Sequence, residues 1–353
     1  MQDKKYKFFT QPYDHQREAF DVSADENNFA LLLDMGTGKT KVTLDTIGYL
    51  FEKSKINFVL VVAPKGVIPN WIPEIEAHLP PRIEREIVLW NPSLSKQRRD
   101  ELNDLHTKSK KLKFLLMNVE AFSTAKGVEV AEIFVQKFNT FMVVDESTTI
   151  KNRKAKRTKA LCAVGREAVY RRILTGSPVT RSPLDLFSQM AFLDPKILGF
   201  SSFYAFQGRY SIVSRRTMGA HSFNQVVGFR RLDELTDKLS EHSYRVKKED
   251  CLDLPDKVYT KRTVALTVEQ HIAYAQMKKL ALARLDSGEL STTKNVLTQI
   301  MRLQQICCGN LTDDDGKIHS LPSNRIKELL DLCEELQGKA IIWATWTMDI
   351  RSI

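Results

Sequence analysis

Residues 29–40 read FALLLDMGTGKT, a short apolar run that leads into a glycine turn. The apolar run predicts a buried strand, and Gly36, Thr37, Gly38, Lys39 and Thr40 predict a phosphate-binding loop whose backbone N–H groups approach phosphate oxygens. Lys39 would bring positive charge to the β- and γ-phosphates, and the Thr40 hydroxyl would bind Mg²⁺. The usual loop has another glycine where Leu33 stands, so this is a variant form. The alternative is a tight turn without a ligand.

The segment after the loop predicts a helix that reaches about residue 52, because Leu44, Ile47 and Phe51 share one helical face. The N-terminus of that helix would face the phosphates. A second buried strand, FMVVD at 141–145, ends at Asp145 and Glu146. Asp145 would hold Mg²⁺ and Glu146 would accept a proton from an attacking water. The alternative for this acidic pair is an N-terminal helix cap.

Six apolar runs predict the strands of one domain, with helical segments between most of them. They lie at 29–33, 58–63, 87–90, 113–118, 141–145 and 171–175. Runs that are apolar at consecutive positions are typical of parallel strands buried on both faces. The expected fold class is therefore α/β, with a mainly parallel sheet between helices, in a domain that spans residues 1–195.

The remainder of the chain predicts two further parts. Residues 196–322 turn helical and mixed, with helical spacing at 232–243, 267–286 and 293–307, and are expected to form a helical protrusion. Residues 323–353 predict a helix at 323–337 and a strand at 340–346, which would begin a second sheet that the chain leaves incomplete. The basic run 151–159 is interpreted either as a solvated helix face or as a phosphate contact.

Composition favours a polyanionic partner and a reducing compartment. The 353 residues include 53 Lys and Arg against 43 Asp and Glu, a net charge of +10. The odd number of cysteines argues against a disulfide framework, and their spacing does not suggest a zinc site; they are Cys162, Cys251, Cys307, Cys308 and Cys333. The chain has no uncharged apolar run of about 20 residues, so we expect no membrane association. These features together predict a cytoplasmic protein.

An ordered series of motifs resembles superfamily-two helicase-like ATPases, and most closely their Swi/Snf-related branch. The series comprises YDHQREAF (13–20), DMGTGKT (34–40), VVAPKGVIPNW (61–71), LLMNVEAF (115–122), DESTTIKN (145–152) and LTGSPVTRSPLDLF (174–187). YRVKKEDCLDLPDK (244–257) and MRLQQICCG (301–309) add to the likeness. The resemblance implies a RecA-like lobe with a helical protrusion and the start of a second RecA-like lobe.

The resemblance also implies a function and a set of roles. The function is that of an ATP hydrolase, stimulated by DNA, that moves along or remodels duplex DNA and uses ATP with Mg²⁺. Gln16 would recognise adenine, Lys39 and Thr40 the phosphates and Mg²⁺, Asp145 the Mg²⁺, and Glu146 the water. Coupling or DNA contact would fall to Lys65, Trp71, Asn118, Thr175, Gly176 and Ser177. Trp71 could instead be a core aromatic, and Gln16 a surface helix residue.

Two departures from the family pattern stand out. Thr148 occupies a position where the family usually has histidine, so the link from this side chain to 174–177 must be rebuilt or lost. The basic run of the family is reduced to residues 245–248. The arginines of the second lobe are expected to lie outside this chain, which predicts weak hydrolysis by the chain alone. If the first lobe stabilised the phosphoryl charge itself, the candidates would be Lys151, Arg153 and Arg181.

Two other functions stay open at this point. One is an ATP-gated DNA-binding or scaffold module without turnover, and the other is an RNA helicase of the same superfamily. The compact chain without histone-reader segments suggests a bacterial or phage source.

Overall fold

The computed structural model describes residues 6–92, 100, 102, 104–105, 107, 109–218, 221–251, 253, 255, 257–286, 293–313 and 316–353. The chain forms two compact units, Met1–Pro255 and Asp256–Ile353. Each is described here by itself.

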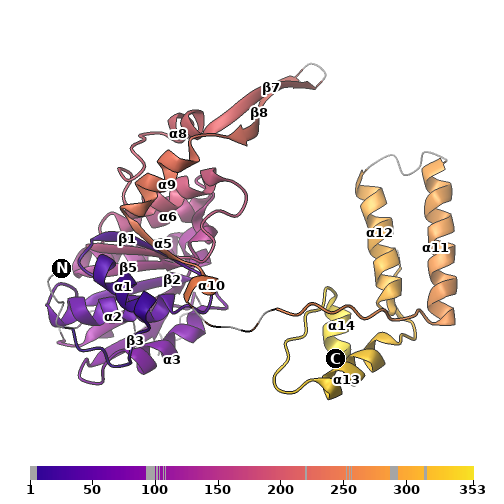
Figure 1. Ribbon diagram of the computed structural model, residues 1–353, viewed down its shortest axis with the longest axis horizontal. Coiled ribbons are helices and arrows are strands. Elements are labelled where there is room, and N and C mark those ends of the chain that lie inside the picture. The colour runs from indigo at the N-terminus through magenta and orange to yellow at the C-terminus, as the bar shows by residue number, and fades with distance from the viewer. Residues whose placement is uncertain are drawn as a thin grey trace. The chain divides into compact units, whose positions relative to one another are not determined.

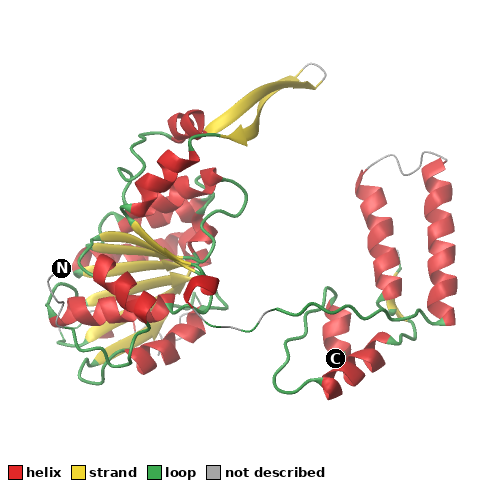
Figure 2. Cartoon of the chain, in the orientation of Figure 1, coloured by secondary structure: helices red, strands yellow, loops and turns green. Residues whose placement is uncertain are grey.

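Unit 1 is built on a seven-stranded parallel sheet in the order β3-β4-β2-β5-β6-β1-β9 (Figures 1 and 2). The strands are β1 (Asn28–Leu33), β2 (Phe58–Ala63), β3 (Arg85–Leu89), β4 (Leu112–Asn118), β5 (Thr140–Asp145), β6 (Tyr170–Leu174) and β9 (Ser243–Val246). All six strands expected from the sequence are confirmed. The central strands are buried on both faces, as consecutive apolar residues require.

Helices cover both faces of this sheet and complete a three-layer α/β unit. On one face lie α1 (Asp14–Ser23), α2 (Lys39–Glu52) and α3 (Ile68–His78), which share a core with Leu31 and Leu33. On the other lie α5 (Ala125–Lys137), α6 (Lys156–Gly165) and α7 (Leu186–Leu193), which share a core with Ala30 and Leu32. Neighbouring residues of β1 therefore enter opposite cores.

The segment after residue 195 differs from the expected helical protrusion. It contains α8 (Phe203–Tyr210), an antiparallel hairpin of β7 (Ser211–Met218) and β8 (His221–Phe229), α9 (Leu232–Ser240), β9 and the short α10 (Lys248–Cys251). Strand β9 pairs with β1 in parallel, from Ala30 opposite Ser243 to Leu33 opposite Val246. The backbone hydrogen bonds of this pairing hold the segment in unit 1, so the compact unit runs beyond the expected boundary at 195.

Unit 2 contains two long helices, α11 (Val268–Asp286) and α12 (Thr293–Cys307), and the shorter α13 (Arg325–Glu335) and α14 (Thr347–Ser352). Strands β10 (Asn310–Thr312) and β11 (Ile318–Ser320) form a small antiparallel pair. The helices expected at 267–286, 293–307 and 323–337 are confirmed within a few residues. The strand expected at 340–346 is not: residues 339–344 are irregular and Trp343 is 90% exposed. A lone apolar segment without a neighbouring strand cannot satisfy its backbone groups as a sheet.

Three further findings concern the cysteines, membrane-spanning helices and metal-binding clusters. All five cysteines are free thiols. Within the described residues, none of the helices has the length and apolarity that crossing a membrane requires. The same residues contain no cluster of three His, Cys, Asp or Glu side chains arranged to hold a metal ion.

Candidate nucleotide site

The glycine turn lies between β1 and α2 and has the backbone that phosphate binding requires. Gly36 and Gly38 have φ of 81° and 90°, in the left-handed region that favours glycine. A Cβ atom at Gly38 would lie 2.2 Å from Nε2 of Gln16, so any other residue there would displace the Gln16 side chain from the turn as well as adopt a strained backbone. Gly38 caps the N-terminus of the 14-residue helix α2, where unpaired N–H groups and the helix dipole attract an anion.

Lys39 extends from the start of α2 back over the turn. Its Nζ donates to the backbone oxygens of Leu33 (2.8 Å) and Asp34 (3.1 Å). Burial lowers the pKa of Lys39, and the negative charges of Asp145 and Glu146 act in the opposite direction. The lysine is therefore close enough to both carboxylates for their charges to act on it.

Gln16 holds the turn from α1. Its Nε2 donates to the Thr37 carbonyl at 3.1 Å, and its Oε1 accepts from the backbone N–H of Tyr13 at 3.1 Å. The ring of His15 reaches the same carbonyl through Nε2 at 2.8 Å. Gln16 is 5% exposed, so its alternative as a surface helix residue is wrong. Adenine recognition by Gln16 stays a prediction.

A cavity of about 490 Å³ opens beside this turn. Its walls include Tyr13, Gln16, Gly38, Lys39 and Thr40. α3 closes the other side with Glu74 and His78. A cavity of this size, with the turn on one wall, has room for a small nucleotide ligand.

Asp145 and Glu146 end strand β5 at the same edge of the sheet. Asp145 Oδ1 accepts from the backbone N–H of Glu146 at 2.9 Å, and burial raises the pKa of Asp145. Glu146 has φ 50° and ψ 61°, a left-handed conformation that is costly for a residue with a side chain. Its carboxylate makes no helix-capping hydrogen bond, so the acidic-cap alternative has no support here.

Trp71 does not lie where its expected DNA-contacting role requires. Its side chain is 1% exposed, and its indole Nε1–H donates to Asp145 Oδ2 at 3.0 Å. The buried hydrogen bond favours the ionised form of Asp145 and thus works against the effect of burial on its pKa. The structure therefore supports the core-aromatic alternative, and it adds a role that sequence reasoning missed, the orientation of Asp145.

Thr148 and Thr175 converge on Glu146. The hydroxyl groups of Thr148 and Thr175 donate to the same Oε1 atom, at 3.1 and 3.2 Å. Because Thr175 follows β6, residues 174–177 are joined directly to the acidic pair. The link left in doubt by the threonine at 148 is thus rebuilt.

Gln189 provides a second connection that the sequence analysis did not identify. Its Oε1 accepts from the hydroxyl of Ser147 at 2.6 Å, and its Nε2 donates to the carbonyl of Pro178 at 2.7 Å. Gln189 is fully buried in α7. One signal was available, because a glutamine inside the apolar stretch FSQMAF needs a buried hydrogen-bond partner.

The other expected coupling residues lie at carboxyl ends of neighbouring strands. Lys65 is exposed after β2, and Asn118 ends β4, where its side-chain amide donates to Glu120 at 3.2 Å. A Cβ at Gly176 would lie 3.2 Å from Cα of Asp34, so the turn after β6 touches the phosphate loop. Ser177 is exposed beside it. Contact of these residues with DNA stays a prediction.

The reduced basic run 245–248 packs beside the phosphate loop. The backbone N–H of Lys248 donates to Asp34 Oδ2 at 3.0 Å, and that of Asp34 donates to the Val246 carbonyl at 3.1 Å. The Lys248 Nζ lies 3.7 Å from where a Cβ of Gly36 would be. Sequence reasoning named this run but did not place Lys248 beside the loop, because 212 residues separate it from Gly36.

Of the other candidate cations, Lys151 and Arg153 have side-chain partners outside the cavity beside the loop, whereas the contact of Arg181 is through its backbone. Lys151 donates to the hydroxyl of Thr180, and the guanidinium of Arg153 lies 4.3 Å from the ring centre of Phe203. The backbone N–H of Arg181 donates to Asp185 at 2.9 Å.

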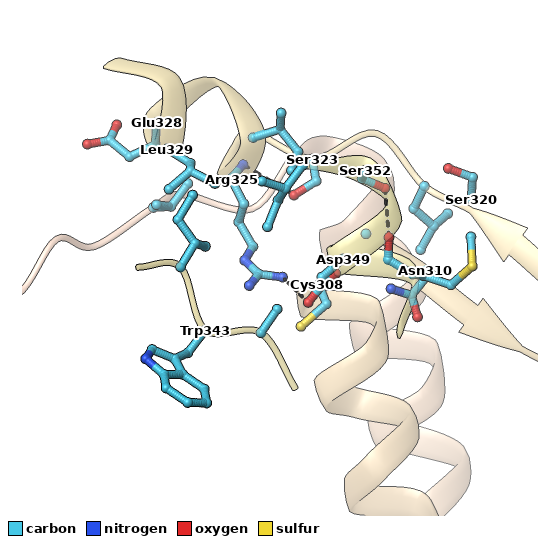
Figure 3. A pocket seen from close by; sticks show the side chains of 18 of the residues that line it. Cys308, Asn310, Ser320, Ser323, Arg325, Glu328, Leu329, Trp343, Asp349 and Ser352 are labelled. Carbon is cyan, nitrogen blue, oxygen red and sulfur yellow. Dashed lines mark hydrogen bonds and ion pairs between the residues drawn. The ribbon is translucent and has the colours of Figure 1, made fainter. Parts of the chain in front are cut away.

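A second cavity, of about 380 Å³, lies within unit 2 (Figure 3). Figure 3 shows Arg325 and Asp349 pointing toward one another, and the guanidinium and the carboxylate are 3.3 Å apart. Cys308 lies on the same wall, and burial raises the pKa of its thiol. An arginine already paired with a carboxylate is poorly suited to a triphosphate, so we place the nucleotide site in unit 1.

This fold and site define a RecA-like domain with a phosphate-binding loop. The chain belongs to the SNF2-related domain family, whose model matches residues 13–311.

Its curated relatives include a probable ATP-dependent DNA helicase of Arabidopsis thaliana, 27% identical over 298 residues, which cover 81% of this chain and 26% of that protein. A subunit of the SWI/SNF chromatin-remodelling complex of Schizosaccharomyces pombe is 28% identical over 81% of this chain and 17% of its own length. The chain thus spans about a quarter or less of these relatives.

A solved structure, the Sulfolobus solfataricus SWI2/SNF2 ATPase core in complex with dsDNA, is similar in fold. The TM-score is 0.52 at 23% identity, over 94% of this chain and 65% of that one. This similarity supports the fold alone.

The expectation of a cytoplasmic protein from a bacterium or a phage-infected cell is contradicted by these comparisons. The relatives include chromatin-remodelling subunits of fission yeast and an ATP-dependent helicase of Drosophila melanogaster. Their names place several of them at eukaryotic chromatin. The compactness of a chain was a poor guide, because extra segments vary among proteins that share one motor fold.

Proposed function

We propose that this chain is the ATP-binding motor lobe of a DNA-stimulated ATPase that moves along or remodels duplex DNA. One observation carries the proposal: Thr175, from the turn after β6, donates a hydrogen bond to Glu146, which follows Asp145 across from Lys39. A nucleotide-binding loop, an acidic pair and a coupling segment therefore meet at one edge of the sheet. Ligands of open α/β sheets bind at this carboxyl edge.

The residues at this edge fit ATP with Mg²⁺. The glycine backbone at 36–38 and the N-terminus of α2 suit the phosphate oxygens, and Lys39 supplies the mobile cation. Thr40 and Asp145 would hold Mg²⁺, which keeps several waters and needs few protein ligands. The bound metal would neutralise charge on the phosphates.

Glu146 would accept the proton of the attacking water. Two threonine hydroxyls orient its Oε1 and leave Oε2 for that task. Thr175, Gly176 and Ser177 would report the state of this carboxylate to DNA, together with Lys65 and Asn118 at the same edge. Hydrolysis by the 353-residue chain should be weak, because Lys151 and Arg153 make the contacts described above instead of facing the cavity beside the loop.

The proposed preference for duplex DNA follows from the family and the net charge of +10. We expect duplex DNA to raise single-turnover phosphate release more than single-stranded DNA or RNA does. Phosphate release with each nucleic acid at saturation is the measurement. Greater stimulation by RNA would favour the RNA helicase. ATP-dependent DNA affinity without any phosphate release would favour the gated binding module.

Trp71→Phe tests whether the indole orients Asp145. The substitution keeps an aromatic ring in the core but removes the donor to Oδ2. We expect the Mg²⁺-dependent part of nucleotide affinity to fall about tenfold, as is common when a hydrogen bond to a metal ligand is lost. Titration of a fluorescent ATP analogue with Mg²⁺ and with EDTA measures that part.

Trp90→Phe is the matched control for this substitution, because Trp90 is only partly buried and packs against the core on the opposite face of the sheet. If the ratio of nucleotide affinity with Mg²⁺ to that with EDTA were the same in the Trp71→Phe variant as in the parent, Trp71 would act in packing alone.

A further inference from the structure

The β7–β8 hairpin has no part in the nucleotide site or the main sheet. Figure 1 shows it projecting from the end of α8, away from the sheet. Its two strands form a separate sheet and pair with each other over eight residue pairs, with one irregularity between Ile212 and Val213. A strand of eight residues is roughly 25 Å long. A ribbon of two strands buries little surface of its own, so its side chains remain available to a partner.

The sequence around the hairpin carries only positive charge. Residues 195–232 contain no Asp or Glu, although the chain has 43 of them in 353 residues and a stretch of this length would ordinarily hold about four or five. The basic residues of the stretch are Lys196, Arg209, Arg215, Arg216, Arg230 and Arg231. This surface therefore matches a polyanion better than a cationic or an apolar partner.

The pairing register places one arginine on each face of the ribbon. Arg215 lies opposite Asn224, and its guanidinium donates to the hydroxyl of Ser222 at 3.0 Å. Arg216 lies opposite Phe223 on the other face. Both arginines are exposed, and neither forms an ion pair within the part of the chain that the structure describes. Each face thus offers a solvated cation.

The base of the ribbon is held firmly on unit 1. Tyr210, where α8 meets β7, is fully buried and donates to Glu234 of α9 at 3.0 Å. Arg230, just after β8, donates to the carbonyls of Gly208 and Arg209 at 2.8 and 3.2 Å. The guanidinium of Arg209 pairs with Glu234. Arg209 and Arg230 thus make structural contacts at the base, which leaves Arg215 and Arg216 as the cations of the ribbon itself.

The ribbon is also connected to the basic run beside the acidic pair. Arg153 of that run stacks on Phe203 and Tyr204, at 4.3 and 5.2 Å from their ring centres, and both belong to the helix that continues into β7. The basic run and the ribbon base therefore belong to one packed region of unit 1.

We propose that the β7–β8 ribbon is a further contact surface for duplex DNA, an inference that rests on the proposed DNA-dependent function. The major groove of DNA is wide enough to admit a two-stranded β-ribbon. Arg215 and Arg216, on opposite faces, would then reach the phosphates that border the groove on its two sides. Such contacts position the protein without selecting a sequence.

A second copy of this chain is the competing occupant, because a hairpin exposes unpaired strand edges. The like charges of Arg215 and Arg216 oppose that pairing. The argument from charge therefore favours DNA.

The Arg215→Ala/Arg216→Ala variant tests the proposal through the salt dependence of binding. Each phosphate contact contributes about 0.9 to the slope of log affinity against log salt, so loss of two should reduce the slope by about 1.8 and weaken binding about tenfold or more at 0.1 M salt. The Lys55→Ala/Lys110→Ala variant also removes two positive charges. Both lysines lie near the amino ends of β2 and β4, at the edge of the sheet opposite the acidic pair, so this variant should keep the parental slope. Fluorescence anisotropy on two unrelated duplexes measures both.

The outcomes separate the inference from the proposed function. A slope in the arginine variant equal to that of the lysine control would overturn the ribbon contact while the parent still binds DNA. A parent chain that binds no duplex would overturn both. The Arg215→Lys/Arg216→Lys variant should keep the parental salt slope, since lysine also pairs with phosphate. Concentration-dependent self-association of the parent that the arginine variant strengthens, seen by sedimentation, would instead identify a second copy as the occupant.

Discussion

Lys39→Ala is expected to abolish measurable binding of Mg²⁺ and ATP by this chain. A lysine that bridges the β- and γ-phosphates makes charge-assisted hydrogen bonds worth about 1.5–3 kcal/mol each, so losing two of them weakens binding by at least about 100-fold. The helix N-terminus and the glycine backbone remain but cannot replace a mobile charge. Titration with a fluorescent ATP analogue measures the change.

Lys55→Ala is the matched control, because it removes one exposed positive charge near the far end of α2. Circular dichroism of both variants checks folding, since Lys39 also donates to the carbonyls of Leu33 and Asp34. Equal nucleotide affinity in the Lys39→Ala variant and the parent would show that this turn does not bind phosphate, and the proposed function would fail with it.

Glu146→Gln is expected to separate binding from turnover. Glutamine keeps the length of the side chain, and its carbonyl oxygen can still accept from Thr148 and Thr175. The amide cannot take a proton from water, so hydrolysis should fall by about 10²–10⁴-fold while nucleotide affinity stays close to that of the parent. Single-turnover phosphate release with saturating duplex DNA, compared with the fluorescent nucleotide titration, tests both parts.

Glu129→Gln on the exposed surface of α5 controls for the loss of one negative charge. If the Glu146→Gln variant released phosphate at the parental rate, another group would be the base. If the chain is instead a gated DNA-binding module without turnover, the parent, Glu146→Gln and Glu129→Gln should all release phosphate equally slowly.

The α/β fold and the phosphate loop were predictable because their signals are local. Strands such as Phe58–Ala63 are apolar at every position, and parallel burial leaves few alternatives for such runs. The glycines at 36 and 38 adopt the left-handed backbone that a phosphate loop predicts. The start of α2 at Lys39 follows from the same turn.

The contacts around the acidic pair depend on residues far apart along the chain. Trp71 and Asp145 are 74 positions apart, and Ser147 and Gln189 are 42 apart. Their hydrogen bonds form because β2, β5 and β6 are neighbours and present their carboxyl ends together. A motif assigns a residue type to a role, but it does not tell whether the indole of Trp71 faces solvent or a buried carboxylate.

The extent of unit 1 was also decided by tertiary pairing and could not be predicted from local sequence. Ser243–Val246 is too short and too polar to be recognised as a strand from its own residues, yet it pairs with β1 because that edge of the sheet would otherwise expose unpaired backbone groups. The segment 340–346 is the reverse case. Its apolar residues predicted a strand, but the strands described in unit 2, β10 and β11, pair with each other and not with this segment. Local chemistry thus determined which residues could bind phosphate and form the central strands. Tertiary pairing decided which residues orient Asp145 and Glu146, because backbone and side-chain hydrogen bonds need partners that only the folded chain brings within reach.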